Sequence, residues 1–588
     1  SKLSDPGLTN HSFTVETTSD PIWYAIQAMP YIRDYSDRNC ISLANALFAN
    51  SLAAHIVDQN PAIEKVFKQW KNMEKQGENA LASNLQKNQE LKNILLRETP
   101  WLLEAMDEAS QKQNIALLFE LNTVNQDKRQ IIQFLQGLQR YDGGFSWYPG
   151  GKSSDFITMY VLELIGKLQE LKIVSADGTL NSLAQKAIEY SDKAISDRYQ
   201  KLLELADKKL IQLDADQISY MDVYYLYVRS LFAEQEYKHN AREASVYFLN
   251  QAQKYWLGKD LYLQGMMALT LHKRGNSATA LSILKSVEER SILNPELGRY
   301  WKTKPGYHWF ELPIETQSML ISAFDKIYED KQIVAELQLW LLKNKQTNRW
   351  KTGKASIAAV HSLLLNRKLT PEATQMMSVE LGNVKIQPEV GEKGYEAGTG
   401  YFKKEFGPEK IHSGMKNIEL ENPNDYIAWG AAYWQYFQDL DKIKSFTDTP
   451  IKISRELFVV KDGKKGETLV QIDAKTIVKQ GDKISVRLRI EVDRPMDFIH
   501  LKDQRGAAME SIEQISQYKW SGGLFYYMSP KDSSTDMFIE HLPRGVYILD
   551  YTLRAVHAGT FSNGIANIQS IYAPEFSSHS DGTIIKIQ

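Results

Sequence analysis

The sequence predicts a multidomain α + β protein, in which an α/α toroid of helical hairpins is followed by antiparallel β-sandwich domains. Three observations lead to this prediction. The 588 residues exceed what one hydrophobic core usually holds and suggest about three or four domains. Amphipathic helical runs fill the long middle of the chain. Short alternating runs, separated by turn residues, fill its C-terminal part.

The composition is that of an ordinary globular protein, with 43% hydrophobic and 24% charged residues. A net charge of −2 predicts neither a nucleic-acid partner nor a basic membrane-binding patch. No uninterrupted apolar run reaches the roughly 20 residues of a membrane span, and the N-terminus, SKLSDPGLTN, lacks a signal-peptide hydrophobic region. Because the first residue is Ser rather than Met, we expect a fragment of a longer protein.

The first twenty residues predict one strand, because residues 11–19 alternate apolar and polar side chains. After Pro21 the pattern becomes helical and stays so to about residue 382, with many breaks at Gly, Asn or Asp. No fixed repeat period is present, which argues against a solenoid and favours a closed toroid. The predicted helices are Ile22–Ile32, Ile41–Ile56, Ile63–Glu74, Trp101–Glu108, Asp127–Gln139, Asp155–Leu171, Leu180–Leu205, Asp216–Phe232, Ala241–Trp256, Leu261–Lys273, Ala278–Glu289, Pro313–Ile327, Gln332–Lys343, Lys354–Leu365 and Pro371–Leu381.

Residues 383–450 predict further strands, at Val384–Ile386, from Tyr401 onward and at the aromatic-rich Ala428–Tyr436. Residues 451–588 predict a β-sandwich, because turn residues such as Asp462-Gly463 recur at the spacing of short antiparallel strands. The strands expected there are Glu456–Val460, Thr468–Ile472, Lys483–Val492, Phe498–Lys502, Gly523–Met528, Asp536–Leu542, Val546–Ala555 and Thr583–Ile587.

One break between helices is unusual, the segment YDGGFSWYPGGK at Tyr141–Lys152. Its glycines permit positive φ and close backbone approach, and its aromatic side chains supply packing area. Two interpretations stay open: a structured loop that covers one face of the helical domain, or a ligand-facing loop. The residues that carry either role are Gly143, Gly144, Phe145, Trp147, Tyr148, Pro149 and Gly150.

The stretch Tyr35–Ser51 holds the only cysteine, Cys40, where a polar run gives way to an apolar helical run. A thiol at a helix N-terminus can be activated, because unpaired N–H groups and the helix dipole stabilise its thiolate. One cysteine excludes an internal disulfide and a multi-cysteine metal site. The histidines form no metal-binding motif and no phosphate- or dinucleotide-binding loop is present, so we expect no metal and no cofactor.

Other candidates for chemistry also have structural explanations. Glu311 and Glu315, with Asp155, could be the acids of a glycan-active enzyme, or first-turn residues that favour the helix dipole. A run of tyrosines could be a sugar platform or helix packing: Tyr220, Tyr224, Tyr225 and Tyr227. Asp503 and Arg505 could form a local ion pair.

Several segments, in order along nearly the whole chain, carry a resemblance to a known family. They are TTSDPIWYAIQAMPYI, YDGGFSWYPGGKSSDFITMYVLELI, YHWFELPIETQSMLISAF, NRWKTGKASIAAVHSLLL, EAGTGYFKK, AWGAAYWQYFQDLDKI, FIHLKDQRGA, VHAGTFSNGIA and IYAPEFSSHSDG. These segments resemble the C-terminal half of bacterial alpha-2-macroglobulins, especially the long Bacteroidetes type. The resemblance implies a thioester-type toroid over 21–382, inserted into a CUB-like domain made of 1–20 and 383–450. It implies a macroglobulin-like domain of the receptor-binding type over 451–588.

In that family the toroid usually carries Cys-x-Glu-Gln, whose thiol and carboxamide condense to a thioester that acylates a trapped protease. Aligned by its flanks, this chain has Asn39 at the cysteine, Ile41 at the glutamate and Ser42 at the glutamine. A register that uses Cys40 instead puts Leu43, which has no carboxamide, three residues on. We therefore expect the thioester to be lost and Cys40 to be unreactive. The family's acyl-transfer histidine finds no match in Gly143–Asp155 either.

The resemblance implies a non-enzymatic endopeptidase inhibitor that traps proteases by conformational change without a covalent thioester. The alternatives are a pure cell-surface binding scaffold and the glycan-active toroid enzyme. Implied partners are proteases, through the full-length parent, and other cell-envelope proteins. Implied localisation is the periplasm or the cell surface.

Overall fold

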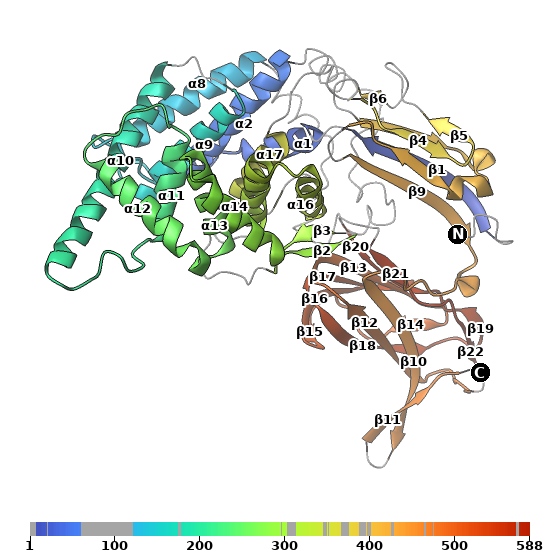
Figure 1. Cartoon of the computed structure of the whole chain (residues 1–588). Helices are drawn as coiled ribbons and strands as arrows, with labels where there is room; N and C mark the ends of the chain where they lie inside the picture. Colours follow the sequence, from blue (N-terminus) through green and yellow to red (C-terminus); the bar gives the residue numbers. More distant parts are fainter. Residues whose placement is uncertain are drawn as a thin grey trace.

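A computed structural model of the chain describes residues 8–19, 22–59, 121–173, 178–295, 297–302, 313–344, 350, 352–365, 375–386, 395–396, 401–424, 428–463, 466–473, 476–571 and 576–588. Within these ranges, the helices gather in one body and most strands form two others (Figure 1). The predicted helices Ile63–Glu74 and Trp101–Glu108 lie outside the described residues. The predicted fold class, a helical toroid followed by antiparallel sandwiches, is confirmed.

Six helices form a closed inner ring, in which each contacts the next and the last returns to the first. They are buried on most sides, because one side faces the ring centre and another faces outer helices. Helix α1 (Ile22–Ile32) contacts the first and last members at the seam. In ring order the six are α2 (Cys40–Gln59), α9 (Asp155–Glu170), α11 (Tyr220–Ser230), α13 (Leu261–Lys273), α15 (Pro313–Ala323) and α17 (Gly353–Leu364).

Among the described residues, five helices lie outside this ring, and each packs against an inner helix. They bury one face only, as the amphipathic periodicity predicts. The outer helices are α8 (Leu121–Leu138), α10 (Gly178–Asp207), α12 (Ala241–Tyr255), α14 (Ser277–Glu289) and α16 (Lys331–Lys343).

Local capping explains why several helices begin where the sequence predicts. Ser219 and Asp222 form a reciprocal capping box at the start of α11. Asp260 caps α13 by accepting a hydrogen bond from the backbone N–H of Leu263 at 2.9 Å. The bounds predicted for α1 and α13 agree with the structure.

A small β body combines strands from both sides of the helical ring. Strand β1 (Leu8–Thr18) pairs with β7 (Tyr401–Phe406) and β9 (Trp429–Gln438), and β6 (Tyr395–Glu396) extends this sheet. A second sheet, in the order β5-β4-β8, packs on it through an apolar core. Its strands are β4 (Ser378–Leu381), β5 (Val384–Ile386) and β8 (Ile418–Glu421). In sequence, the ring therefore lies between two strands of one sheet.

Between residues 290 and 382 one predicted helix is wrong, and one hairpin was not predicted. The helix predicted at Pro371–Leu381 ends in strand β4, whose side chains alternate between half-buried and buried. This alternation places Val379 and Leu381 in the core between the two sheets, which outweighs helix propensity. The hairpin of β2 (Ile292–Asn294) and β3 (Gly298–Tyr300) was not predicted, because three-residue strands give almost no periodic signal.

The C-terminal body is a sandwich of a five-stranded and a six-stranded antiparallel sheet around one apolar core. The five-stranded sheet has the order β11 (Gly466–Gln471), β10 (Ile451–Gly463), β12 (Lys483–Val492), β18 (Gly545–Ala555) and β14 (Met509–Ser511). The six-stranded sheet has the order β15 (Gln517–Ser521), β16 (Leu524–Pro530), β17 (Ser534–Leu542), β13 (Met496–Gln504), β20 (Ala566–Ser570) and β21 (Ser577–His579). Strand β19 (Gly559–Ser562) pairs with β22 (Ile584–Ile587). The short strands β14, β15, β19, β20 and β21 were not predicted.

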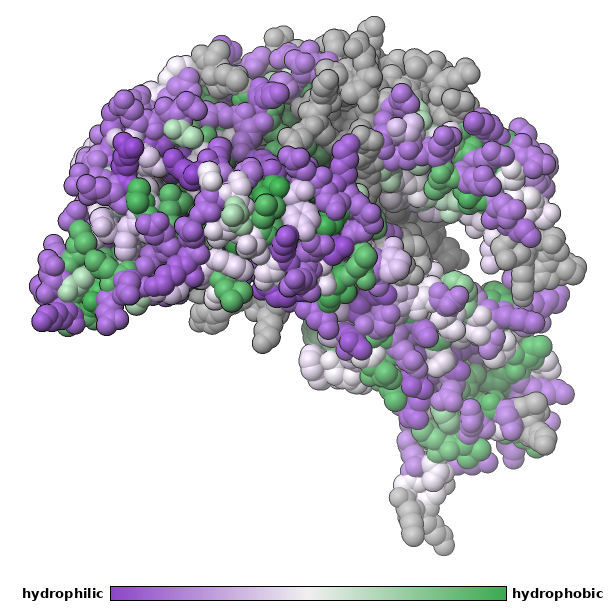
Figure 2. All heavy atoms as spheres, viewed as in Figure 1, coloured by the Kyte–Doolittle hydropathy of each residue, from purple (hydrophilic) through white to green (hydrophobic). Residues whose placement is uncertain are grey.

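Helix α2 differs from the expectation that no apolar segment of the chain is as long as a membrane span. By length and composition alone this 20-residue helix is apolar enough to cross a membrane, although no uninterrupted apolar run was expected to reach that length. In the structure 78% of the apolar stretch of this helix is buried inside the protein, as in the core helix of a globular domain. The exterior of the ring is mainly hydrophilic in the view of Figure 2, with apolar side chains scattered over it.

Candidate functional site

The start of helix α2 holds Asn39 and Ser42, which the family resemblance places at the cysteine and glutamine of the thioester motif. Asn39 precedes the first helical residue, and its Oδ1 accepts a hydrogen bond from the backbone N–H of Ser42 at 2.9 Å. The Ser42 hydroxyl donates in return to the Asn39 carbonyl oxygen at 2.9 Å. Asn39 therefore acts as an N-cap, which satisfies a backbone donor that the helix leaves unpaired. The two side chains are engaged in capping.

Cys40 lies beside this cap and points into the protein. Its side chain is fully buried in the apolar core of the ring. Burial raises the pKa of the thiol from 9.0 to about 12, because the thiolate would have to form without solvation. Burial therefore opposes the thiolate that a position at a helix N-terminus would otherwise favour. Ile41, on the next position, is half-buried and packs against the same core.

The glycine-rich loop touches the start of α2. The backbone N–H of Cys40 donates to the carbonyl oxygen of Trp147 at 3.0 Å. Trp147 and Tyr148 stack with ring centroids 6.4 Å apart, and both side chains are exposed. The loop therefore occupies one backbone donor of the first turn of α2, the N–H of Cys40.

Short hydrogen bonds hold the loop in one shape. Phe145 is fully buried, and its N–H donates to the Thr158 hydroxyl at 2.8 Å. Gly143 has φ +89°, and a Cβ there would lie 2.4 Å from the Lys186 carbonyl oxygen, so glycine is required. Pro149 and Gly150, at the tip, are exposed. The interpretation as a structured loop is supported, and the exposed Trp147 and Tyr148 leave a contact role available.

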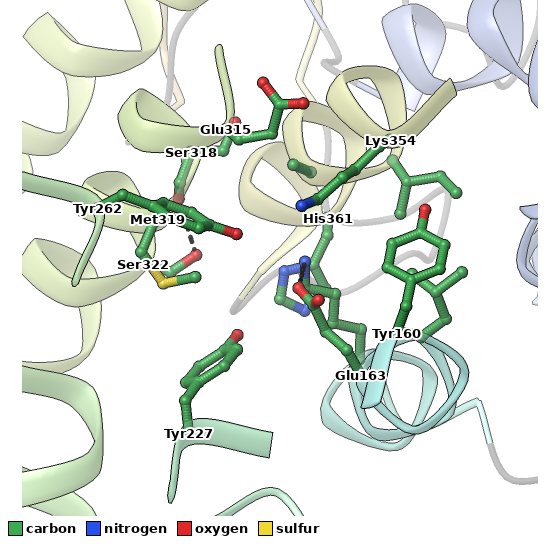
Figure 3. A pocket seen from close by; sticks show the side chains of 14 residues that line it. Tyr160, Glu163, Tyr227, Tyr262, Glu315, Ser318, Met319, Ser322, Lys354 and His361 are labelled. Carbon is green, nitrogen blue, oxygen red and sulfur yellow. Dashed lines mark hydrogen bonds and ion pairs between the residues drawn. The ribbon is translucent and has the colours of Figure 1, made fainter. Parts of the chain in front are cut away.

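A second group of polar residues lies at the centre of the ring (Figure 3), and Glu315 is its one acidic or basic member that was a candidate from the sequence. Glu163 and Lys167 on α9 form a buried ion pair of 2.6 Å. The Tyr224 hydroxyl donates to the other oxygen of Glu163 at 2.6 Å. Lys354 of α17 lies within 6 Å of the ring centroids of three aromatic residues, at 5.6, 5.9 and 5.8 Å. These residues are Phe156, Tyr160 and Tyr262.

The two buried carboxyl groups of this central group, Glu163 and Glu315, have pKa values that are shifted in opposite directions. Burial alone would raise the pKa of Glu163, but Lys167 and Lys354 together lower it below its ordinary value. Burial raises the pKa of Glu315, whose carboxylate oxygens make no hydrogen bond to a described residue. Burial lowers the pKa of Lys354. The signal that could have revealed this group is a pair of charges four residues apart in the apolar segment ITMYVLELIGKL.

The glycan-enzyme alternative predicted that its acids share a cleft, and the structure does not support this. Asp155 lies at the start of α9, where the Tyr190 hydroxyl donates to it at 2.7 Å, and it does not line the central cavity. Glu311 lies outside the described residues. The free space around Glu315 is about 10 Å³, which admits a water molecule but no sugar ring.

Two smaller candidates are also explained. The tyrosines Tyr224, Tyr225 and Tyr227 are buried packing residues, and Tyr220 packs against the same core. The predicted ion pair between Asp503 and Arg505 is wrong. Asp503 instead pairs with Arg455 at 2.8 Å inside the sandwich. Arg505 donates to the Ser534 carbonyl oxygen at 2.9 Å.

Groups of three or more His, Cys, Asp or Glu side chains that could hold a metal ion are absent from the described part of the chain.

Comparison with known proteins gives matches to bacterial alpha-2-macroglobulins. Residues 451–575 match the model of the bacterial alpha-2-macroglobulin MG10 domain. An alpha-2-macroglobulin homolog from Nostoc sp. is 23% identical over 465 residues, which cover 76% of this chain and 23% of the relative. The chain therefore spans about a quarter of the length of this curated relative.

Two solved structures match this chain at a lower sequence identity than the Nostoc relative. Trypsin-activated alpha-2-macroglobulin from Escherichia coli is 12% identical, and the match covers 98% of this chain and 34% of that one with a TM-score of 0.41. Salmonella alpha-2-macroglobulin reacted with methylamine is 12% identical, with 98% and 32% covered and a TM-score of 0.33. The two sequence matches show that this chain is similar to bacterial alpha-2-macroglobulins and that its C-terminal sandwich resembles their MG10 domain.

Proposed function

We propose that this chain is the C-terminal part of an alpha-2-macroglobulin-like endopeptidase inhibitor that traps proteases by conformational change, without a covalent thioester. The family relationship supports an inhibitor rather than an enzyme. In this proposal residues 21–382 are the thioester-type domain, residues 1–20 and 383–450 are CUB-like, and the partners of the parent are proteases. The E. coli relative solved after activation by trypsin illustrates the class of partner.

The capping pair at the start of α2 carries the proposal. An internal thioester needs a thiolate and, three residues on, a carboxamide that can lose ammonia. Here Asn39 and Ser42 stand at these positions and bond to each other's backbone. The neighbouring thiol of Cys40 is buried, and its pKa is raised to about 12. None of these groups supplies the acyl-transfer chemistry.

Treatment of the native full-length parent with methylamine tests the absence of the thioester. We expect no mass gain in the peptide that contains residues 39–43, and no thiol released before unfolding. A mass gain of one methylamine at this peptide, or rapid appearance of a titratable thiol, would overturn the claim.

A protease-protection assay on the same parent tests the trapping mechanism. After cleavage, the protease should lose activity toward large protein substrates and keep it toward small peptides. The complex should separate fully under denaturing conditions, because no covalent bond links the two proteins. If cleavage causes neither compaction nor shielding, trapping is wrong and the pure binding scaffold remains.

The exported localisation is part of the same proposal. Contact with foreign proteases requires a position in the periplasm or on the cell surface, where other envelope proteins are further partners. Fractionation of cells that express the parent, with detection by antibody, tests this. Recovery with the cytoplasmic fraction alone would contradict it.

A further inference from the structure

A polar cleft of about 570 Å³ lies beside the glycine-rich loop, away from the ring centre. Its walls are the end of α8, the first residue of the loop and the first turns of α10. The volume falls within the range of about 300–1,000 Å³ that small-ligand sites occupy. The lining includes Gln139, Arg140, Tyr141, Thr179, Ser182 and Lys186.

The cleft has an excess of positive charge. Arg140 and Lys186 both line it, and neither forms an ion pair with any residue in the described part of the chain. The described lining residues include no carboxylate. The acid next in sequence, Asp142, instead accepts hydrogen bonds from the Gly144 N–H at 3.1 Å and the Ser153 hydroxyl at 2.6 Å. Because the whole chain has 70 basic and 72 acidic residues, this local excess does not follow from composition.

The backbone that carries these groups is fixed before any ligand arrives. The N–H of Arg140 donates to the Gly144 carbonyl oxygen at 2.8 Å, and the Arg140 carbonyl oxygen accepts from the Gly143 N–H at 3.0 Å. The Gln139 amide donates to the carbonyl oxygens of Gly143 and Leu183, both at 2.9 Å, and so ties the loop to α10. Such preorganisation lowers the entropy lost on binding.

The remaining lining favours an extended chain over a compact ion. Ser182 presents a neutral hydroxyl group, which suits the N–H and C=O groups of a peptide. The Tyr141 side chain is fully exposed at the rim and offers an aromatic surface. Two cations on different elements can each take one carboxylate.

We propose that this cleft binds an acidic polypeptide segment, whose carboxylates pair with Arg140 and Lys186. The site is separate from the thioester positions and does not depend on protease trapping. Its occupant is defined by chemistry: at least two Asp or Glu side chains on an extended strand, which lies across the cleft and packs on Tyr141.

Fluorescence anisotropy of a dye-labelled hexaglutamate peptide, titrated with the 588-residue chain, tests the proposal. We expect saturable binding that weakens as salt rises. The double variant Arg140→Gln with Lys186→Gln should weaken it about tenfold or more, since two charge-assisted contacts are lost. Both side chains reach solvent, so circular dichroism should show an unchanged fold.

The matched control is Lys201→Gln, an exposed lysine on the same helix that does not line the cleft. Its binding should equal that of the original chain. Absence of saturable binding, equal weakening by the control, or equal binding of a hexalysine peptide would overturn the proposal. Competition by inorganic phosphate or polyphosphate at lower concentrations than the free peptide would also overturn it, in favour of a phosphate ligand.

Discussion

The Oδ1 atom of Asn39 accepts the backbone N–H of Ser42 at 2.9 Å, and Ser42 returns a hydrogen bond to Asn39. In thioester-bearing relatives these two positions hold the reactive cysteine and glutamine, as the resemblance of the sequences implies. Here the same spacing of three residues serves a different purpose, because an N-cap side chain commonly accepts the N–H of the residue three positions further on. A spacing suited to a covalent link is therefore equally suited to capping.

Asn39→Ala should lower the free energy of unfolding by about 1 kcal/mol, because the first turn of α2 loses its cap. Urea denaturation followed by circular dichroism measures the change. Asn39→Ser should keep the cap without placing a second carboxylate beside Asp37, and should unfold near the original urea concentration. Equal midpoints for Asn39→Ala and the original chain would show that the hydrogen bond contributes nothing.

Cys40 should resist alkylation in the native chain. Its thiol is buried, and burial raises its pKa to about 12, so the thiolate population at pH 8 is negligible. Mass spectrometry after iodoacetamide treatment should show no adduct in buffer and one adduct in concentrated urea. Adduct formation at equal rates in both conditions would contradict the burial.

The ion pair of Glu163 and Lys167 should behave as a buried pair. Lys167→Met leaves Glu163 charged and buried, and should destabilise the ring by about 3–5 kcal/mol. Adding Glu163→Gln to this variant should recover part of the loss, because it removes a buried charge that only Lys354 then compensates. Thermal unfolding of both variants measures this. A double variant less stable than Lys167→Met would contradict the explanation.

The contribution of Glu170 to the free energy of unfolding should depend on pH in the acid range. Burial opposes its ionisation, but His361 and Lys326 lower its pKa below the ordinary 4.5. A carboxyl with a lowered pKa stabilises the fold above pH 4.5, and this contribution is lost as the pH falls through the lowered value. Original chain and Glu170→Gln should therefore differ in melting temperature at pH 7 and converge in acid. A constant difference would exclude this linkage.

Two glycines of the loop form a matched pair. Gly143→Ala places a Cβ 2.4 Å from the Lys186 carbonyl oxygen, whereas a Cβ at Gly150 meets nothing within 4 Å. Both have positive φ, so Gly150→Ala should cost roughly 1 kcal/mol from backbone strain alone. Gly143→Ala should cost clearly more, as urea midpoints would show. Equal costs would mean that the loop moves to accommodate the methyl group.

Local patterns predicted the helical part well. The bounds of α13 follow from Asp260 as N-cap and from the apolar run behind it, both readable in the sequence. Strand β4 was mispredicted, since its partners β5 and β8 are not visible in the four residues themselves. The family resemblance indicated the family, and the domain match over 451–575 confirms that indication.

The sequence could have indicated only one part of the central polar group, the charged pair of Glu163 and Lys167 on one helix. Glu163, Lys354 and Glu315 come from three helices that meet only when the ring closes. Their spacing in sequence carries no information about this meeting. The polar cleft beside the loop likewise depends on how α8 and α10 lie next to each other, which periodicity does not determine.

The pairing of β1 with β9 has a consequence for how the protein is made. Ser12 and Gln435 bond across the sheet although 423 residues separate them in sequence. Synthesis proceeds at about 5–20 residues per second, so β9 is synthesised roughly 20–80 s after β1. During that time the edges of β1 are open to other strands, which is an aggregation hazard. The helical ring can close in this interval, so the sheet is completed around a domain that has already folded.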